Sequence, residues 1–203
     1  VRCRNYNHQT RYILPIAPSP NLPTQHSIYL YPTTCLFEGT VVSLGRGTDA
    51  PFEVYGHPDM RNREYSFTPQ PNNGSKNPPH EGKVCYGEDL RNVSDEAIIS
   101  EGINLEYVID AYRDLNIGEK FFTQMFEKLI GVAWVREMIK QGYTAEQIRE
   151  RWSEDVQAYK ELRRKLSETC ALQAYFLEMN KSCIESNTTL KAEKKAKILQ
   201  RQE

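Results

Sequence analysis

The sequence predicts an α+β domain in which a small, mixed, turn-rich β portion is followed by several helices. Short runs with strand-like alternation, separated by prolines and glycines, fill residues 1–93. From about residue 94 to residue 165, apolar residues recur at helical spacing. A chain of 203 residues can enclose a sizeable core in one domain, or in one domain with an appendage.

Two elements are expected before residue 35. The pattern of residues 1–16 predicts a strand that ends before Pro18. Its apolar side chains are Tyr12, Ile13, Leu14 and Ile16. Thr24 is a candidate N-cap for a short helix, because its hydroxyl can accept a hydrogen bond from a free backbone N–H group of the first turn. The inner face of this helix would carry Ile28 with Leu30 or Tyr31.

Alternation predicts three further strands over residues 51–56, 64–68 and 83–90. Residues 69–82 read PQPNNGSKNPPHEG, and this composition cannot build a core. We therefore expect residues 69–82 to form a surface loop.

Four apolar patterns predict the helical portion. Behind a candidate cap at Asn104 come Leu105, Val108, Tyr112 and Leu115. A second stripe consists of Phe121, Phe122, Met125, Phe126 and Leu129. A third, stopped by Gly142, consists of Val132, Val135, Met138 and Ile139. Thr144 and Gln147 match a capping box. The helix that it predicts carries Ile148, Trp152, Val156 and Tyr159 on one face.

Composition excludes several classes of function. The 26 basic and 27 acidic residues leave a net charge of -1, which gives no electrostatic case for nucleic acid as a partner. No apolar run is long enough to predict a membrane span. The five cysteines are scattered and the histidines form no ligand set, so no metal site is expected. GRGT lacks the phosphate-loop pattern, and no cofactor is expected.

Candidate site residues cluster within residues 18–53, where prolines and glycines impose several turns between aromatic residues. Glu38 follows an apolar run, which would suit a general acid or a group that binds a sugar hydroxyl. A surface glutamate that accepts from backbone amides is the alternative. Arg46 lies between two glycines and could grip a carboxylate, or could pair with Glu38 or Glu53 in a merely structural turn.

The aromatic residues of this region also have two interpretations. They could stack against sugar rings, or they could be core residues, which is commoner at strand positions. They are Tyr29, Tyr31, Phe37, Phe52, Tyr55 and Tyr65.

The runs PSPNLPT, YPTTCLFEGT, LGRGTDAPFEVYGHP and KVCYGEDLRN keep an order and spacing that resemble the carboxy-terminal domain of NamZ-type exo-β-N-acetylmuramidases. The resemblance covers about residues 1–165, and NYNHQTRY and VSLGRGT are similar to its Bacteroidetes branch. Thr33 and Leu44 depart from the residues that many members have there, Gly and Glu. Residues 166–203 resemble no part of the family, and we expect them to be a poorly ordered tail.

The resemblance implies a glycoside hydrolase that removes terminal N-acetylmuramic acid (MurNAc) from the non-reducing ends of peptidoglycan fragments. It implies a periplasmic or secreted protein whose active site lies between this domain and a Rossmann-like amino-terminal domain. The glutamates proposed as catalytic belong to that domain, which is missing from this chain, so no catalytic residue is carried over. The residues that match the cleft-facing motifs are Glu38, Gly39, Thr40, Arg46, Gly47 and Thr48, with Glu53 behind them.

The resulting hypothesis is that residues 31–53 form one wall of a sugar site. Arg46 would grip the lactyl carboxylate of MurNAc, and it should share one concavity with Glu38. The alternatives are a non-catalytic saccharide-binding module and a purely structural module, each needing the separate Rossmann-like domain for activity.

Overall fold

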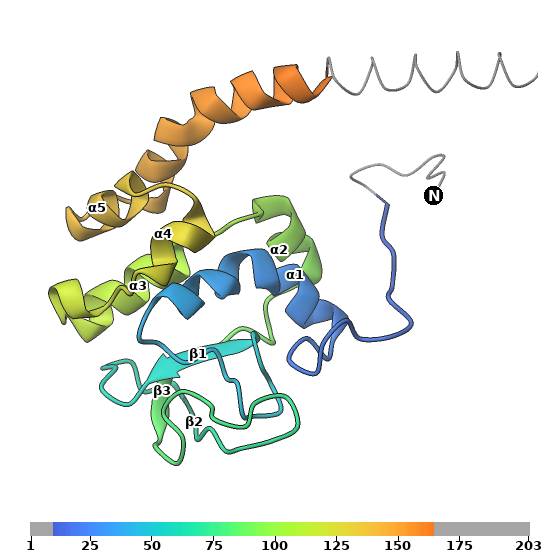
Figure 1. The fold of residues 1–203 in the computed structure, drawn as a ribbon, viewed down its shortest axis with the longest axis vertical. Coiled ribbons are helices and arrows are strands. Elements are labelled where there is room, and N and C mark those ends of the chain that lie inside the picture. Colours follow the sequence, from blue (N-terminus) through green and yellow to red (C-terminus); the bar gives the residue numbers. More distant parts are fainter. Residues whose placement is uncertain (1–9, 165–203) are drawn as a thin grey trace, which may run out of the picture. The chain divides into compact units, whose positions relative to one another are not determined.

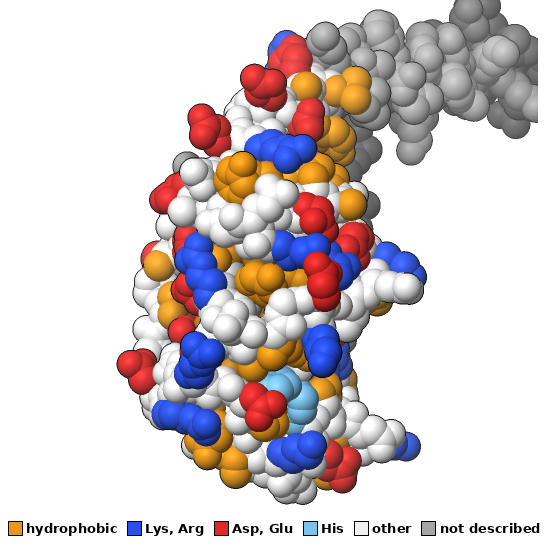
Figure 2. Space-filling view, turned by 90° about the vertical axis from the view of Figure 1, so that its left-hand side faces the viewer, with side chains coloured by type: hydrophobic (Ala, Val, Ile, Leu, Met, Phe, Trp, Pro, Cys, Tyr) orange, Lys and Arg blue, Asp and Glu red, His pale blue; other side chains and the backbone are white. Residues whose placement is uncertain are grey.

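The computed structural model describes residues 10–164, which divide into two units after Ile148. The first unit combines a small sheet with short helices, and in Figure 1 the helices lie to one side of the sheet. The predicted α+β fold class is confirmed. Figure 2 shows basic and acidic side chains interspersed with apolar ones on the face that it draws. Among the described residues, no helix is both long and apolar enough to cross a membrane.

Helix α1 (Gln25–Thr34) begins at the predicted cap. The Thr24 hydroxyl accepts from the Ser27 N–H group, and the Ser27 hydroxyl accepts in return from the Thr24 N–H group. Leu30 is buried, whereas Tyr31 keeps 39% of its surface exposed. The helix continues into a 3₁₀ turn, η1 (Cys35–Gly39), which carries Glu38.

The sheet has three antiparallel strands in the order β1-β3-β2. They are β1 (Val54–His57), β2 (Tyr65–Phe67) and β3 (Cys85–Asp89). All three fall on predicted segments, but β1 begins three residues later than the alternation of residues 51–56 predicts. The reason is local: Pro51 lacks an N–H group, and Phe52 has a positive φ of 65° that no strand accommodates.

The helices of the second half are α2 (Asp95–Glu101), α3 (Glu106–Leu115), α4 (Met125–Ile130) and α5 (Trp134–Lys140), with a 3₁₀ turn, η2 (Gly118–Lys120). The N-cap of α3 is Leu105, one residue after the predicted Asn104, but the Asn104 side chain still accepts from the Glu106 N–H group of the first turn at 2.8 Å. The predicted Thr144–Gln147 capping box forms, and a helix runs from residue 145 to residue 164. Helix α2 was not predicted, although the Ser94 hydroxyl caps it by accepting from Ala97 N–H.

Two sequence predictions are wrong. Residues 10–16 form no strand, and their apolar side chains are exposed, because no strand pairs with them in the described range. Phe121 and Phe122 belong to no helix, because their backbone lies beside η1 instead. The Val41 N–H group donates to Phe121 O at 3.0 Å, and the Thr123 N–H group donates to Gly39 O at 2.9 Å. Residues 1–9 and the predicted tail over residues 166–203 lie outside the described residues.

The core places η1 against α4. Phe37 stacks on Tyr55 with ring centroids 4.6 Å apart, and both side chains are fully buried. A Cβ atom on Gly39 would lie 2.4 Å from the Cα atom of Phe126, so only glycine permits this approach. The contact fixes the turn that carries Glu38.

Candidate functional site

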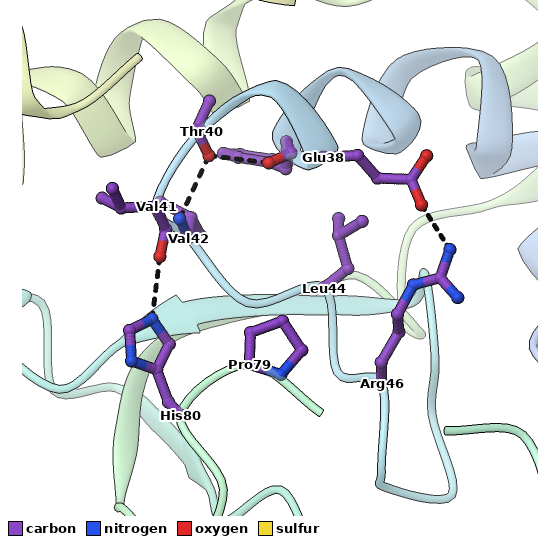
Figure 3. A pocket seen from close by; sticks show the side chains of 9 residues that line it. Glu38, Thr40, Val41, Val42, Leu44, Arg46, Pro79 and His80 are labelled. Atoms are coloured by element: carbon purple, nitrogen blue, oxygen red, sulfur yellow. Dashed lines mark hydrogen bonds and ion pairs between the residues drawn. The ribbon is translucent and has the colours of Figure 1, made fainter. Parts of the chain in front are cut away.

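A pocket of about 490 Å³ opens beside η1, a volume typical of small-molecule sites (Figure 3). Its walls come from η1, the segment after it, the GRGT turn and the loop over residues 69–82. The lining residues are Phe37, Glu38, Thr40, Val41, Val42, Leu44, Arg46, Pro79 and His80. Apolar side chains therefore surround a small number of polar groups, as in many ligand sites.

Glu38 and Arg46 meet at the edge of this pocket. Their side chains point toward each other, and the Arg46 Nη2 group donates to a carboxylate oxygen of Glu38 (Figure 3). The two side chains remain 28% and 30% exposed, respectively. A guanidinium has five N–H donors in a planar fork, so Arg46 can bind a second carboxylate while it keeps Glu38. The shared concavity expected from the sequence is present.

The GRGT turn is closed by backbone hydrogen bonds. The Phe52 N–H group donates to Leu44 O at 2.8 Å. Ser43 and Gly56 exchange two further bonds, of 2.8 and 2.9 Å. Within the turn, the Thr48 hydroxyl donates to Gly45 O at 2.6 Å and accepts from the Ala50 N–H group at 3.1 Å. Thr48 therefore holds the turn and does not line the pocket.

Gly47 joins the turn to the loop over residues 69–82. Its φ is +82°, and a Cβ atom there would lie 2.6 Å from Gln70 O and 2.7 Å from the Pro78 ring. The Gln70 N–H group donates to Gly47 O at 2.8 Å. The loop lacks helix and strand, as the sequence predicts, but Pro78 is buried against Gly47. This contact brings Pro79 and His80 into the pocket wall.

His80 was missed as a site residue by the sequence analysis. Its Nε2 group lies 2.8 Å from Val41 O, which only accepts, so Nε2 donates to it. The His80 ring meets the His57 ring edge-on, with centroids 4.5 Å apart. Burial, followed by the electrostatic effect of the neighbouring His80 side chain, lowers the pKa of His57. The Asp59 N–H group donates to His57 Nδ1 at 3.1 Å, which also favours the neutral ring.

The remaining predicted site residues support the backbone around the pocket. The Thr40 hydroxyl donates to Phe37 O at 2.8 Å and accepts from the Val42 N–H group at 3.1 Å, so both of its roles are occupied. Glu53 does not line the pocket: it is 6% exposed and accepts from the Thr24 hydroxyl. Of the seven predicted residues, three line the pocket, namely Glu38, Thr40 and Arg46.

This geometry suits recognition of a small anionic, partly apolar ligand better than catalysis by this chain alone. Among the described residues that line the pocket, Glu38 is the one carboxylate, and it is already paired. Across residues 10–164, no group of three His, Cys, Asp or Glu side chains is placed to hold a metal ion.

The fold and pocket define a small α+β domain with a mostly apolar pocket that the Glu38–Arg46 pair borders. The chain belongs to the family described as exo-β-N-acetylmuramidase NamZ, C-terminal, whose pattern it matches over residues 29–167. The family predicted from the sequence is thereby confirmed.

Two relatives agree with this assignment. The chain is 33% identical over 169 residues to the peptidoglycan β-N-acetylmuramidase NamZ of Bacillus subtilis, with 74% of this chain and 39% of the relative covered. The crystal structure of a DUF1343 family protein from Bacteroides fragilis matches with a TM-score of 0.77 and 56% identity, covering 79% of this chain and 46% of that one. The chain thus spans less than half the length of either relative.

Proposed function

We propose that this chain is the carboxy-terminal part of an exo-β-N-acetylmuramidase. The complete enzyme would hydrolyse terminal MurNAc from the non-reducing ends of peptidoglycan fragments, and this chain would supply one wall of the sugar cleft. The family and the name of the Bacillus relative support a glycoside hydrolase that acts on peptidoglycan. The observation that carries the finer proposal is the part-exposed Arg46 guanidinium, held by Glu38 in an otherwise mostly apolar pocket.

The chemistry of MurNAc fits this arrangement. MurNAc carries a lactyl ether with a carboxylate, and this group distinguishes MurNAc from N-acetylglucosamine. The Arg46 donors that Glu38 leaves free can form a two-pronged, charge-assisted hydrogen bond with that carboxylate. Val42 and Leu44 would then lie against methyl groups of the sugar substituents. Glu38 would keep the guanidinium in place without occupying all of its donors.

The hydrolytic step requires groups from elsewhere. Glycoside hydrolysis generally uses two carboxyl groups that flank the scissile bond. In the described part of the chain, the pocket offers Glu38 alone. We therefore propose that a Rossmann-like amino-terminal domain completes the cleft and carries the catalytic glutamates. By itself this chain would be a non-catalytic saccharide-binding module, and cleavage of a MurNAc glycoside by this chain alone would contradict that assignment.

We also propose that the complete protein acts in the periplasm or outside the cell, because peptidoglycan and the fragments released from it lie there. Cell fractionation followed by immunodetection tests this. Detection in the cytoplasmic fraction alone would contradict it.

The site is tested by substituting Arg46 in the complete two-domain protein. Arg46→Ala should lower kcat/KM for a MurNAc glycoside about 10- to 100-fold, because it removes hydrogen bonds to a charged group. Arg46→Lys should recover part of this, since it keeps the charge and loses the fork. Arg113→Ala is the matched control, because Arg113 is an arginine on α3 in a loose ion pair with Asp110 at 3.8 Å. Unchanged kinetics for Arg46→Ala, with normal folding, would remove Arg46 from the site.

A further inference from the structure

Phe52 has a backbone conformation that its side chain does not favour. Its φ is 65°, in the left-handed region that glycine adopts freely and bulky residues rarely adopt. Among the described residues, three non-glycine residues have positive φ: Phe52, His80 and Asn116. Asn116 ends α3, where asparagine is a common left-handed cap. Phe52 ends no helix, so its conformation calls for another explanation.

The turn imposes this conformation from both sides. The Phe52 N–H group is held by Leu44 O at 2.8 Å, and the next N–H group, that of Glu53, is held by Ala50 O at 3.2 Å. The Glu53 carbonyl then accepts from the Leu90 N–H group at 2.9 Å. Because the backbone on either side is fixed, the direction of the Cα–Cβ bond of Phe52 is fixed with it.

The ring lies under the Arg46 guanidinium. The Cζ atom of Arg46 is 5.0 Å from the ring centroid, within the range of a cation–π contact. Tyr31 packs against the same ring, with centroids 5.2 Å apart at an interplanar angle of 49°. Phe52 is 1% exposed, so the guanidinium contacts an aromatic surface without competing water. Arg46 is therefore held at one end by Glu38 and along its face by Phe52.

We propose that Phe52 is a positioning residue, which orders Arg46 so that its free N–H groups face the pocket. A leucine at position 52 would fill much of the volume but would offer no π face. A glycine would adopt the backbone conformation without strain but would leave a void under Arg46. An aromatic residue at position 52 provides the flat π face on which the Arg46 guanidinium can be held in one orientation. The consequence for ligand binding rests on the proposed function of Arg46.

The experiment follows the Arg46 Nε–H signal by NMR in the complete two-domain protein. In the unmodified protein, this proton should be displaced upfield by the Phe52 ring and should be ordered on the nanosecond timescale. Phe52→Leu should remove the displacement and lower the order parameter. Phe121→Leu is the matched control, since Phe121 is a fully buried phenylalanine that packs on Tyr112 and Phe122. It should lower Tm without moving the Arg46 signal.

Kinetics give the second readout. Phe52→Leu should raise KM for a MurNAc glycoside about 5-fold with kcat within about twofold, and it should raise KM no further in an Arg46→Ala background. The Arg46 NMR signal tests the positioning role of Phe52, whereas the kinetics of Arg46→Ala test the proposed role of Arg46 in binding. Either proposal can therefore fail without the other. An Arg46 signal at its random-coil position in the unmodified protein would overturn the proposal, even if Phe52→Leu does not fold. A signal that Phe52→Leu leaves unchanged would also overturn it.

Discussion

Replacing Gly47 with alanine tests whether the loop over residues 69–82 is a fixed part of the pocket wall. The substitution has two costs. An L-residue at φ +82° is strained by about 1–2 kcal/mol. The new Cβ atom would also lie 2.6 Å from Gln70 O and 2.7 Å from the Pro78 ring, and overpacking of this kind costs about 1–3 kcal/mol. The free energy of unfolding should therefore fall by about 2–5 kcal/mol.

Gly82 provides the matched control, because it lies at the end of the same loop with φ +71°, and a Cβ atom added there would meet nothing within 4 Å. Gly82→Ala should carry the backbone cost alone. Denaturant unfolding of this chain, followed by circular dichroism, measures both variants. The excess loss at Gly47 should be about 1–3 kcal/mol with an unchanged m-value. Equal losses at the two positions would refute the reasoning, because Pro78 and Gln70 would then not press on the GRGT turn.

Three further predictions concern stability and reactivity. Thr24→Ala should lower the free energy of unfolding by about 2–4 kcal/mol in denaturant unfolding, because it removes the α1 cap and the hydroxyl that donates to the buried Glu53 side chain. Thr24→Ser keeps a hydroxyl and should cost less than half as much. Burial opposes protonation of His26, but its 2.6 Å hydrogen bond to Asp95 and one to a backbone carbonyl outweigh this and raise its pKa. The stability that charged His26 contributes should be full below about pH 6.5 and should be lost as pH rises through the raised pKa. The difference in free energy of unfolding between the unmodified chain and His26→Gln should therefore shrink between about pH 6 and pH 9. A difference that stays constant over this range would contradict the assignment. Burial raises the pKa of the Cys85 thiol to about 11, so iodoacetamide at pH 8 should modify Cys85 only after unfolding. Peptide mapping distinguishes Cys85 from the other cysteines, and rapid modification of Cys85 in the folded chain would contradict its burial.

Local signals predicted much of the fold. The capping pairs at Thr24 and Thr144 each lie within one helical turn, so no distant contact is needed to form them. The pairing of Glu38 with Arg46 was also predictable, because the two residues lie only eight positions apart in a segment rich in turn formers. The strand predicted for residues 1–16 does not form over the described residues 10–16 for the opposite reason, since a strand requires a partner that alternation alone does not supply.

The other half of the pocket wall depends on contacts between distant residues. His80 bonds to Val41, 39 positions away, and lies in a loop whose composition indicates only turns. The burial of Pro78 against Gly47 has no periodic signal either. Phe52 lies under Arg46 with a positive φ. The sequence pattern predicted a strand at this position, and a strand would have a negative φ. Tertiary contacts decided each of these positions.

The central claim is that the GRGT arginine binds the carboxylate of a terminal muramic acid residue. The most direct measurement is a crystal structure of this domain together with the proposed amino-terminal domain and bound MurNAc. It should place a lactyl carboxylate oxygen within about 3 Å of the Arg46 guanidinium, with Glu38 still on its other side. A sugar bound away from this pocket, or bound in it with the lactyl group directed away from Arg46, would contradict the claim.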